Sequence, residues 1–226
     1  MNASRFDALI LDMDGVFVNT EPVHFEAFRQ ILAPKGVRIS DEFLYRLVGE
    51  PARKNYLDIS RQYQVELDVD EMVVEHEKKY LQLLHTIDVD LLPGVEDLLA
   101  RAHALKLKVG LCTSSPLIHV RTVLAKVRKN NFAFRKNEHL FHAIVTFDDV
   151  QHKKPHPEPY LKACQKLGVS PQKSLVIEDS RAGVEAAKAA GCACFALRSH
   201  YNSHMDFSIA DHVVDSIEQI VLTGIQ

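Results

Sequence analysis

The chain has 226 residues, of which 46% are hydrophobic and 25% charged, and its formal net charge is −3. These values are typical of a folded protein of one or two domains, and they exclude a disordered tail and a strongly basic protein that binds nucleic acid. No stretch reaches the roughly 20 apolar residues of a membrane span, so we expect a cytoplasmic protein without membrane contact.

The first predicted element is a buried strand over residues 6–12, FDALILD, which ends at Asp12. A short apolar run of this kind is typical of a parallel sheet with both faces covered. Asp14 follows two residues later, so two carboxylates leave the strand together.

Helical patterns then fill residues 18–88, which include EPVHFEAFRQILA, SDEFLYRLV and VDEMVVEHEKKYLQLLH. We expect this helical insertion to form a second, smaller domain. It leaves the sheet just after Asp14, at the edge where parallel sheets bind ligands, so it can act as a lid.

After residue 89, strand and helix patterns alternate. The further strands are LKVGLCT, HAIVTF, SLVIED and CACFAL, and the helices between them are GVEDLLARAHALK, LIHVRTVLAKV, PEPYLKACQKLG and RAGVEAAKAAG. This alternation predicts an α/β fold: a doubly wound, Rossmann-like parallel sheet built from residues 1–17 and 89–226, with the helical domain of residues 18–88 inserted after its first strand.

Some stretches have a plain structural interpretation. We expect the basic stretch at 126–141 to be a solvated surface loop. The cysteines at 112, 164, 192 and 194 lie in strand or helix patterns, which favours reduced, buried thiols, and we favour small core side chains over a metal site at Cys192-x-Cys194.

Polar residues follow several strands at their carboxyl ends. The first strand ends in Asp12 and Asp14, the second in Thr113-Ser114-Ser115 and the fourth in Glu178-Asp179, and Lys154-Pro155 follows the third after a loop. Carboxylates that converge at one edge repel one another unless a cation lies between them. Carboxylate and carbonyl oxygens suit Mg²⁺, which predicts a magnesium site.

Mg²⁺ and Lys154 would let this edge accept a phosphate, with hydroxyl or N–H groups from the Thr113 turn. We therefore expect phosphoryl transfer. Asp12 would attack phosphorus to form an aspartyl phosphate, and Asp14 would act as general acid and then general base.

In order, Asp12-Met-Asp14-Gly15-Val16, Thr113, Lys154-Pro155 and Glu178-Asp179-Ser180 resemble the four motifs of the haloacid dehalogenase superfamily. The stretches NTEPVHFEAF, LLPGVEDLL, KPHPEPYLKAC and VIEDSRAGVEAAKAAG look like the branch that contains beta-phosphoglucomutase, sugar-phosphate phosphatases and phosphoglycolate phosphatases. The resemblance covers essentially the whole chain.

The resemblance implies a role for each matching residue. It makes Asp12 the nucleophile and Asp14 the acid/base, whose backbone carbonyl also binds Mg²⁺. Asp179, with Glu178, completes the metal site. Thr113 and Lys154 bind the transferring phosphate. The resemblance also implies that residues 18–88 are a helical cap. Dehalogenases of the superfamily resemble this chain at Asp12 but lack the second aspartate, so we do not expect a dehalogenase.

Each motif also has a structural alternative. An Asp-x-Asp strand end alone favours a turn, Thr113-Ser114-Ser115 could cap a helix, and so could one of Glu178-Asp179-Ser180. For Asp12-x-Asp14 the joint occurrence of the motifs favours the functional interpretation. For Thr113-Ser114-Ser115 both roles are compatible, because a helix N-terminus also binds phosphate.

Two residues of the insertion are candidates for substrate binding. His24 matches a histidine near the hinge and the acid/base in this branch, and the alternative is a half-buried histidine on the first helix of the insertion. In mutases of the branch, the phosphate-binding arginine stands at the position of Ala52, and Arg53 lies one residue later. A shift of one residue along a helix turns the side chain by about 100°. Asn19 stands where many relatives carry aspartate.

The pairs His152/His156 and His200/His204 are each four residues apart. Neither pair lies in a helical pattern, so we expect solvated loop histidines rather than transition-metal ligands.

We therefore expect a Mg²⁺-dependent phosphatase, a monomer or weak oligomer, acting on a small phosphorylated metabolite such as a sugar phosphate. One alternative is a hexose phosphate mutase of the beta-phosphoglucomutase type. An alternative of another class is a phospho-accepting, receiver-like signalling domain, although receivers have no helical insertion after the first strand.

Overall fold

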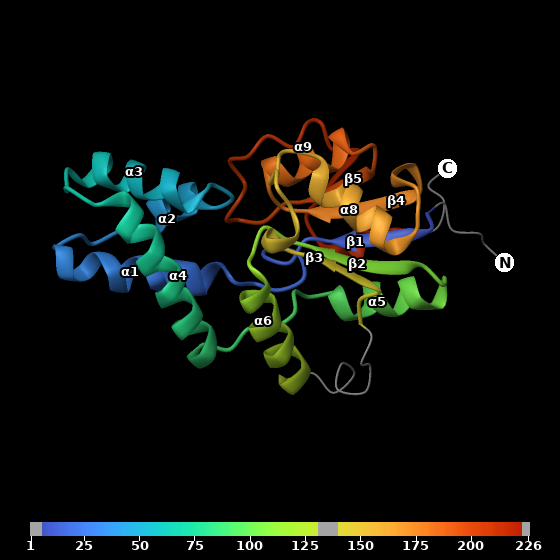
Figure 1. The fold of residues 1–226 in the computed structure, drawn as a ribbon, viewed down its shortest axis with the longest axis horizontal. Helices are drawn as coiled ribbons and strands as arrows, with labels where there is room; N and C mark the ends of the chain where they lie inside the picture. Colours follow the sequence, from blue (N-terminus) through green and yellow to red (C-terminus); the bar gives the residue numbers. More distant parts are fainter. Residues whose placement is uncertain (1–5, 131–139, 223–226) are drawn as a thin grey trace. The chain divides into compact units, whose positions relative to one another are not determined.

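The computed structural model describes residues 6–130 and 140–222 (Figure 1). The chain folds into two compact units. We call them the core unit, Met1–Asn19 with Asp90–Gln226, and the helical unit, Thr20–Val89.

The core unit contains one six-stranded sheet in the order β3-β2-β1-β4-β5-β6, and every neighbouring pair is parallel. The strands are β1 (Ala8–Leu11), β2 (Lys108–Cys112), β3 (Ala143–Val145), β4 (Ser174–Glu178), β5 (Ala193–Leu197) and β6 (His212–Val214). Every residue of β1 and β4 is buried, as expected for central strands with both faces covered.

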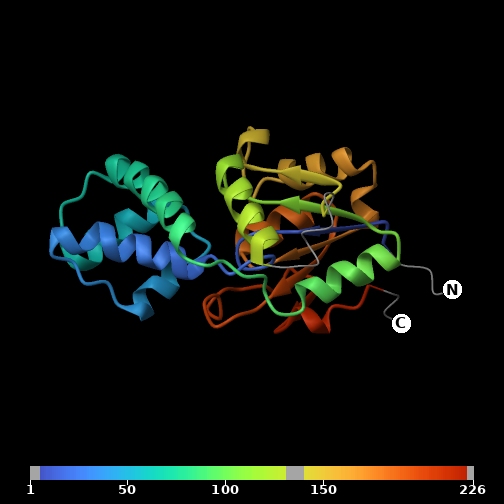
Figure 2. The same ribbon diagram turned by 90° about the horizontal axis from the view of Figure 1, so that it is seen from below.

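Helices cover both faces of this sheet: α8 (Glu158–Leu167) and α9 (Arg181–Ala189) lie on one face, and α5 (Val95–Ala104) lies on the other (Figures 1 and 2). Among the described residues of the core unit, the remaining long helix is α6 (Leu117–Asn130). The predicted doubly wound α/β fold, with an all-helical insertion after the first strand, is confirmed.

The helical unit contains α1 (Glu21–Leu32), α2 (Asp41–Leu47), α3 (Ala52–Tyr63) and α4 (Val69–Thr86). Side-chain caps define two of the helix starts: Ser40 Oγ accepts the backbone N–H of Phe43, and Asp68 accepts those of Asp70 and Glu71. Helices α1 and α4 pack against each other along the unit.

The expectation of a surface loop at 126–141 was wrong for its first part. Helix α6 continues to Asn130, because the apolar helical spacing brings Val127 into the core, where it is 2% exposed. Residues 131–139 lie outside the described part of the chain.

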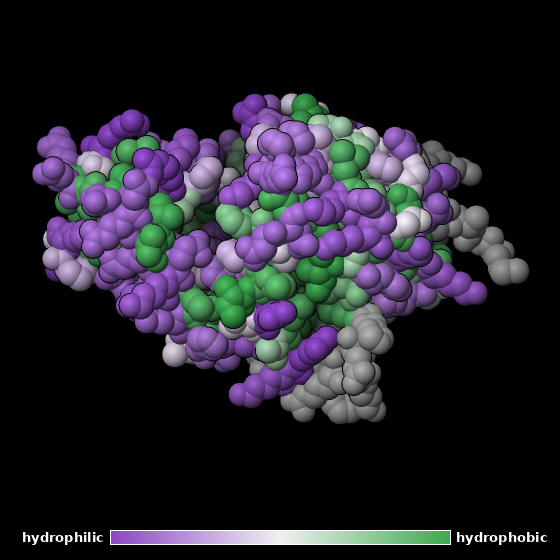
Figure 3. All heavy atoms as spheres, in the orientation of Figure 1, coloured by the Kyte–Doolittle hydropathy of each residue, from purple (hydrophilic) through white to green (hydrophobic). Residues whose placement is uncertain are grey.

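The surfaces in view are mainly hydrophilic on both units, with hydrophobic side chains gathered in smaller patches (Figure 3). Among the described residues, no helix is long and apolar enough to cross a membrane. All four cysteines are buried free thiols, as predicted.

Candidate active site

The carboxyl ends of the three central strands bring the predicted site residues together. Strand β1 pairs with β2 on one side and with β4 on the other, and all three run in the same direction. Asp12, Thr113 and Glu178-Asp179 therefore meet at one edge of the sheet. Asp12, Thr113, Glu178 and Asp179 are all buried, with exposures of 8% or less.

A tight turn follows Asp12 and carries Asp14. Phe17 donates its backbone N–H to the carbonyl of Met13, and Gly15 donates to Val18. Gly15 has φ +76°, and a Cβ at this position would overlap the carboxylate of Asp179. The turn therefore needs glycine both for its left-handed backbone and for the close approach of Asp179.

Lys154 connects the strand ends electrostatically. Its Nζ donates to Asp12 Oδ1 at 2.7 Å, to Glu178 Oε1 at 2.5 Å and to the carbonyl of Cys112 at 3.0 Å. Its side chain is only 5% exposed. One ammonium group thus holds two carboxylates from two different strands in place.

Glu178 is fully engaged by its neighbours. Its Oε1 also accepts the hydroxyl of Tyr160, while Oε2 accepts the backbone N–H groups of Asp179 and Ser180 and the hydroxyl of Ser180. A Cβ at Gly183 would overlap its carboxylate. Glu178 is therefore positioned to hold Lys154 and the first turn of α9, and it has little capacity left for other partners.

The carboxylate of Asp14 contacts hydroxyl groups that follow β2. Its Oδ2 accepts the hydroxyl of Ser115 at 2.8 Å, with the hydroxyl of Thr113 farther away at 3.5 Å. Asp14 is half-buried, so solvent still reaches part of the residue. This arrangement fixes the orientation of the Asp14 carboxylate.

The pKa values of Asp12 and Lys154 depend on each other. Burial raises the pKa of Asp12, Lys154 lowers it, and the charges of Glu178 and Asp14 raise it further, to about 8 in total. Burial lowers the pKa of Lys154, but Asp12 and Glu178 raise it well above its ordinary value. The site therefore needs further positive charge to keep Asp12 ionised at neutral pH.

Asp12, Glu178 and Asp179 form a group that could hold a metal ion. Each offers a carboxylate oxygen, and these atoms lie within 4.8 Å of one another. An all-oxygen, anionic set suits Mg²⁺. A divalent ion would also supply the positive charge that the site needs to keep Asp12 ionised. Because the oxygens of Glu178 are already hydrogen-bonded, we expect Asp12 and Asp179 to be the direct ligands.

Metal binding should therefore release a proton from Asp12. With a pKa of about 8, Asp12 is mostly protonated at pH 7, and a bound cation requires the carboxylate. We expect Mg²⁺ titration calorimetry at pH 7 to give heats that depend on the ionisation enthalpy of the buffer. Asp12→Asn has no proton to release at this position and serves as the control. Wild-type heats that are the same in every buffer would contradict the assignment.

The other predicted residues are Ser114 in the core unit and His24 and Arg53 in the helical unit. Ser114 is exposed at the end of β2. In the helical unit, His24 Nδ1 lies 3.1 Å from Nε2 of the buried His76, and its ring stacks on Tyr80. Arg53 forms an ion pair with Asp70 at the surface of the same unit.

Three residues that the sequence did not single out support the site. Ser115 orients Asp14, Tyr160 binds Glu178, and Asn202 donates its side-chain amide to the carbonyl of Asp179 at 2.8 Å. Asn202 is fully buried. Ser115 belongs to a polar triplet visible in the sequence, whereas Tyr160 resembles any core aromatic residue and Asn202 any loop asparagine.

Comparison with known proteins identifies relatives over most of the chain. Residues 9–197 match the family described as haloacid dehalogenase-like hydrolase. A phosphorylated carbohydrates phosphatase of Thermotoga maritima is 34% identical over 82% of each chain.

Solved structures with the same architecture include two with related sequences. A CbbY mutant of Rhodobacter sphaeroides in complex with xylulose-(1,5)bisphosphate is 26% identical, with a TM-score of 0.77 over 95% of this chain and 96% of that one. The beta-phosphoglucomutase of Clostridium difficile is 27% identical, with a TM-score of 0.73 over 96% of this chain and 93% of that one.

Proposed function

The chain belongs to the haloacid dehalogenase-like hydrolases, and from this we propose that it is a Mg²⁺-dependent phosphatase of small phosphorylated sugars. The observation that carries the proposal is that Lys154 binds both Asp12 and Glu178 at the ends of neighbouring parallel strands. Asp179 lies beside these carboxylates, and Asp14 is two residues from Asp12 in the chain. A buried, anionic edge with one lysine suits a phosphate only when a cation is present.

Asp12 is the proposed nucleophile. One of its carboxylate oxygens attacks phosphorus, the bond from phosphorus to the sugar oxygen breaks, and the phosphoryl group stays on Asp12 as an acyl phosphate. Water then attacks that phosphorus, which releases inorganic phosphate and regenerates the carboxylate. Lys154, which holds Asp12 Oδ1 at 2.7 Å, fixes the orientation of the carboxylate and offsets its charge.

Asp14 is the proposed proton carrier. It donates a proton to the leaving sugar oxygen in the first step and takes one from the attacking water in the second. The hydroxyl of Ser115 binds Oδ2 and so orients the carboxylate for this exchange.

The proposed phosphate and metal contacts complete the site. Thr113, Ser114 and Lys154 would bind the transferring phosphate, with the hydroxyl and N–H groups of the β2 turn as donors. Mg²⁺ held directly by Asp12, Asp179 and the Asp14 carbonyl, with the hydrogen-bonded Glu178 beside them, would neutralise charge that builds up on the phosphate oxygens.

The substrate class rests on the relatives and on the helical unit. The Thermotoga relative is named for phosphorylated carbohydrates, and the CbbY structure contains a sugar bisphosphate. We propose that the helical unit, including His24 and Arg53, is a cap that selects among such substrates, and that the protein acts as a monomer or weak oligomer without a nucleic-acid partner.

A mutase must also hold the distal phosphate of a bisphosphate. Arg53, the candidate for that contact, stands one residue after the position of the mutase arginine, which favours hydrolysis over phosphoryl return to the sugar. A phosphatase screen over a broad panel of sugar and polyol phosphates, with and without a hexose bisphosphate, separates the two. We expect multiple-turnover phosphate release; isomerisation that needs the bisphosphate would indicate a mutase, and phosphorylation without turnover a receiver-like protein.

Replacing Asp14 by asparagine should affect substrates according to their leaving groups. Sugar alkoxides need a proton as they leave and aryl oxides hardly do, so we expect a loss on the order of 10²–10³-fold for sugar phosphates and a much smaller one for aryl phosphates under single turnover. Burst kinetics on both substrate types measure this first step separately. Equal losses in that step would contradict the role of Asp14 as general acid.

A further inference from the structure

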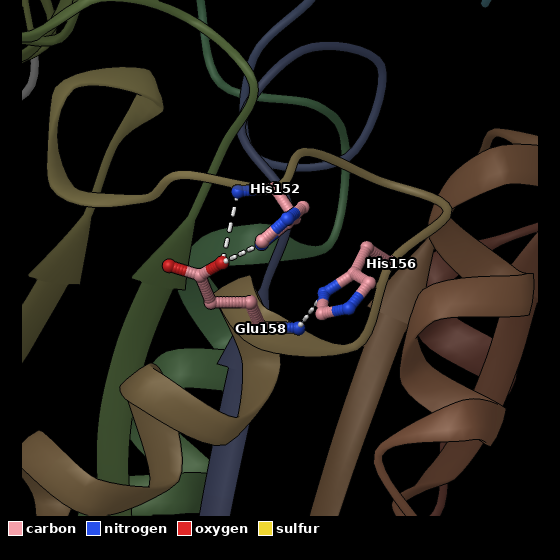
Figure 4. Close-up of side chains that lie close together, drawn as sticks. All are labelled: His152, His156 and Glu158. Atoms are coloured by element: carbon pink, nitrogen blue, oxygen red, sulfur yellow. Dashed lines mark hydrogen bonds and ion pairs between the residues drawn. The ribbon is translucent and has the colours of Figure 1, made fainter.

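The loop before α8 brings together two histidines and a glutamate outside the proposed active-site cluster. Figure 4 shows the imidazoles of His152 and His156 on the same side of the loop, with the carboxylate of Glu158 beside His152. The two ring centroids lie 4.6 Å apart. His152 Nδ1 is 3.0 Å from Glu158 Oε2. The turn between His152 and His156 brings their side chains together, which their spacing in the sequence did not predict.

The carboxylate of Glu158 is fixed and ionised. Its Oε1 accepts the backbone N–H of Gln151 at 2.9 Å, and Oε2 accepts that of His152 at 2.8 Å. One anionic ligand is thus held in place next to two imidazoles.

We propose that His152, His156 and Glu158 form a second metal site, for a borderline transition-metal ion such as Zn²⁺. One ligand atom from each of the three lies within 4.8 Å of the others. Bonds of about 2.0–2.2 Å place neighbouring ligands of a tetrahedral ion about 3.4 Å apart. The His152–Glu158 pair is already near this spacing, and only the exposed imidazole of His156 has to approach.

The donor set distinguishes this site from the acidic one. Two imidazole nitrogens and one carboxylate suit Zn²⁺, Ni²⁺ or Cu²⁺, whereas Mg²⁺ prefers oxygen ligands. Both histidines are exposed, so solvent can complete the coordination. The histidines are exposed loop residues, as expected, and the proposal gives them a further role as metal ligands.

An ion bound at this second metal site would affect the loop that carries Lys154. Lys154 lies between the two histidines in the chain, and its Nζ holds Asp12 and Glu178. An ion bound by His152 and His156 would restrain the backbone on both sides of Lys154. Binding of the ion would raise the free energy of unfolding, more so the tighter it binds, independently of any hydrolysis.

Titration calorimetry with Zn²⁺, in a large excess of Mg²⁺ to occupy the acidic group, tests the proposal. We expect the wild type to bind one more Zn²⁺ than the double variant His152→Ala/His156→Ala. The matched control, His200→Ala/His204→Ala, removes another loop pair with the same spacing and should bind like the wild type. Glu158→Gln keeps a hydrogen-bond acceptor but loses the charge, and we expect its affinity to fall at least about tenfold.

Thermal melting of each variant without metal checks that it is folded. The side chain of His152 is 64% exposed, so its loss should leave the melting curve close to that of the wild type. Zn²⁺ should raise the melting temperature of the wild type more than that of His152→Ala/His156→Ala. Equal Zn²⁺ stoichiometry and equal shifts in these two proteins would overturn the proposed site.

Discussion

Asp12→Asn is expected to reduce phosphate release from every substrate by on the order of 10⁴-fold or more, because an amide cannot form the acyl phosphate. Both hydrolysis of a generic aryl phosphate and that of sugar phosphates should be lost, since they share this step. The fold should be retained: burial raises the pKa of Asp12 to about 8, so a neutral side chain of the same shape replaces a carboxyl that is costly to ionise. Steady-state phosphate release and urea unfolding measure the two effects.

The matched control for this variant is Asp7→Asn. Asp7 is exposed and precedes the same strand at its other end. It should leave turnover and stability unchanged. Normal turnover by Asp12→Asn would rule out Asp12 as the nucleophile.

Lys154→Met is expected to lower the free energy of unfolding by about 3–5 kcal/mol, because it leaves the buried carboxyl groups of Asp12 and Glu178 without their cation. The side chain of Lys154 is 5% exposed, and that of Glu178 is fully buried, so solvent screens this loss very little. With a pKa of about 8, Asp12 is mostly neutral at pH 5 and gains from the charge of Lys154 only as the pH rises through that value. The destabilisation should therefore be smaller at pH 5 than at pH 8.

Urea unfolding in metal-free buffer at both pH values measures this effect. Lys153→Met is the matched control, since the neighbouring Lys153 is exposed and its ammonium lies over the ring of Phe147. Its change should stay within about 1 kcal/mol. A similar small change for Lys154→Met would contradict the buried ion network.

The parts of the fold that could be predicted are those with a strong hydrophobic pattern. The central strands are continuous apolar runs, and α9 is bounded by a Ser180 cap and by Gly191, both visible in the sequence. The expected resemblance to the family was also confirmed, because the family matches residues 9–197, which contain all four motifs in order.

The elements that escaped prediction have weak patterns. Strand β6 has three residues, of which only Val214 is buried, and it forms by pairing with β5. Helix α3 is mostly polar and buries only Asn55, Tyr56 and Ile59. Tertiary contacts decide both, and no local signal carries those contacts.

For the site, the sequence predicted which residues lie at the strand ends, but it did not predict which side chains hydrogen-bond to them. The convergence of Asp12, Thr113 and Glu178 follows from parallel strands. That Ser115 rather than Ser114 binds Asp14, or that Tyr160 reaches Glu178, depends on turn geometry and helix packing. The same holds for His152 and His156, which only the folded loop brings together.

Trapping the covalent intermediate tests the proposed mechanism most directly. The enzyme is mixed with a sugar phosphate and Mg²⁺, quenched with acid during turnover, reduced with borohydride and mapped by peptide mass spectrometry. Borohydride reduces an acyl phosphate to the alcohol, so we predict homoserine at position 12 in the wild type and unmodified peptide when the substrate is omitted. Turnover without reduction at Asp12, or reduction at another carboxylate, would contradict the mechanism.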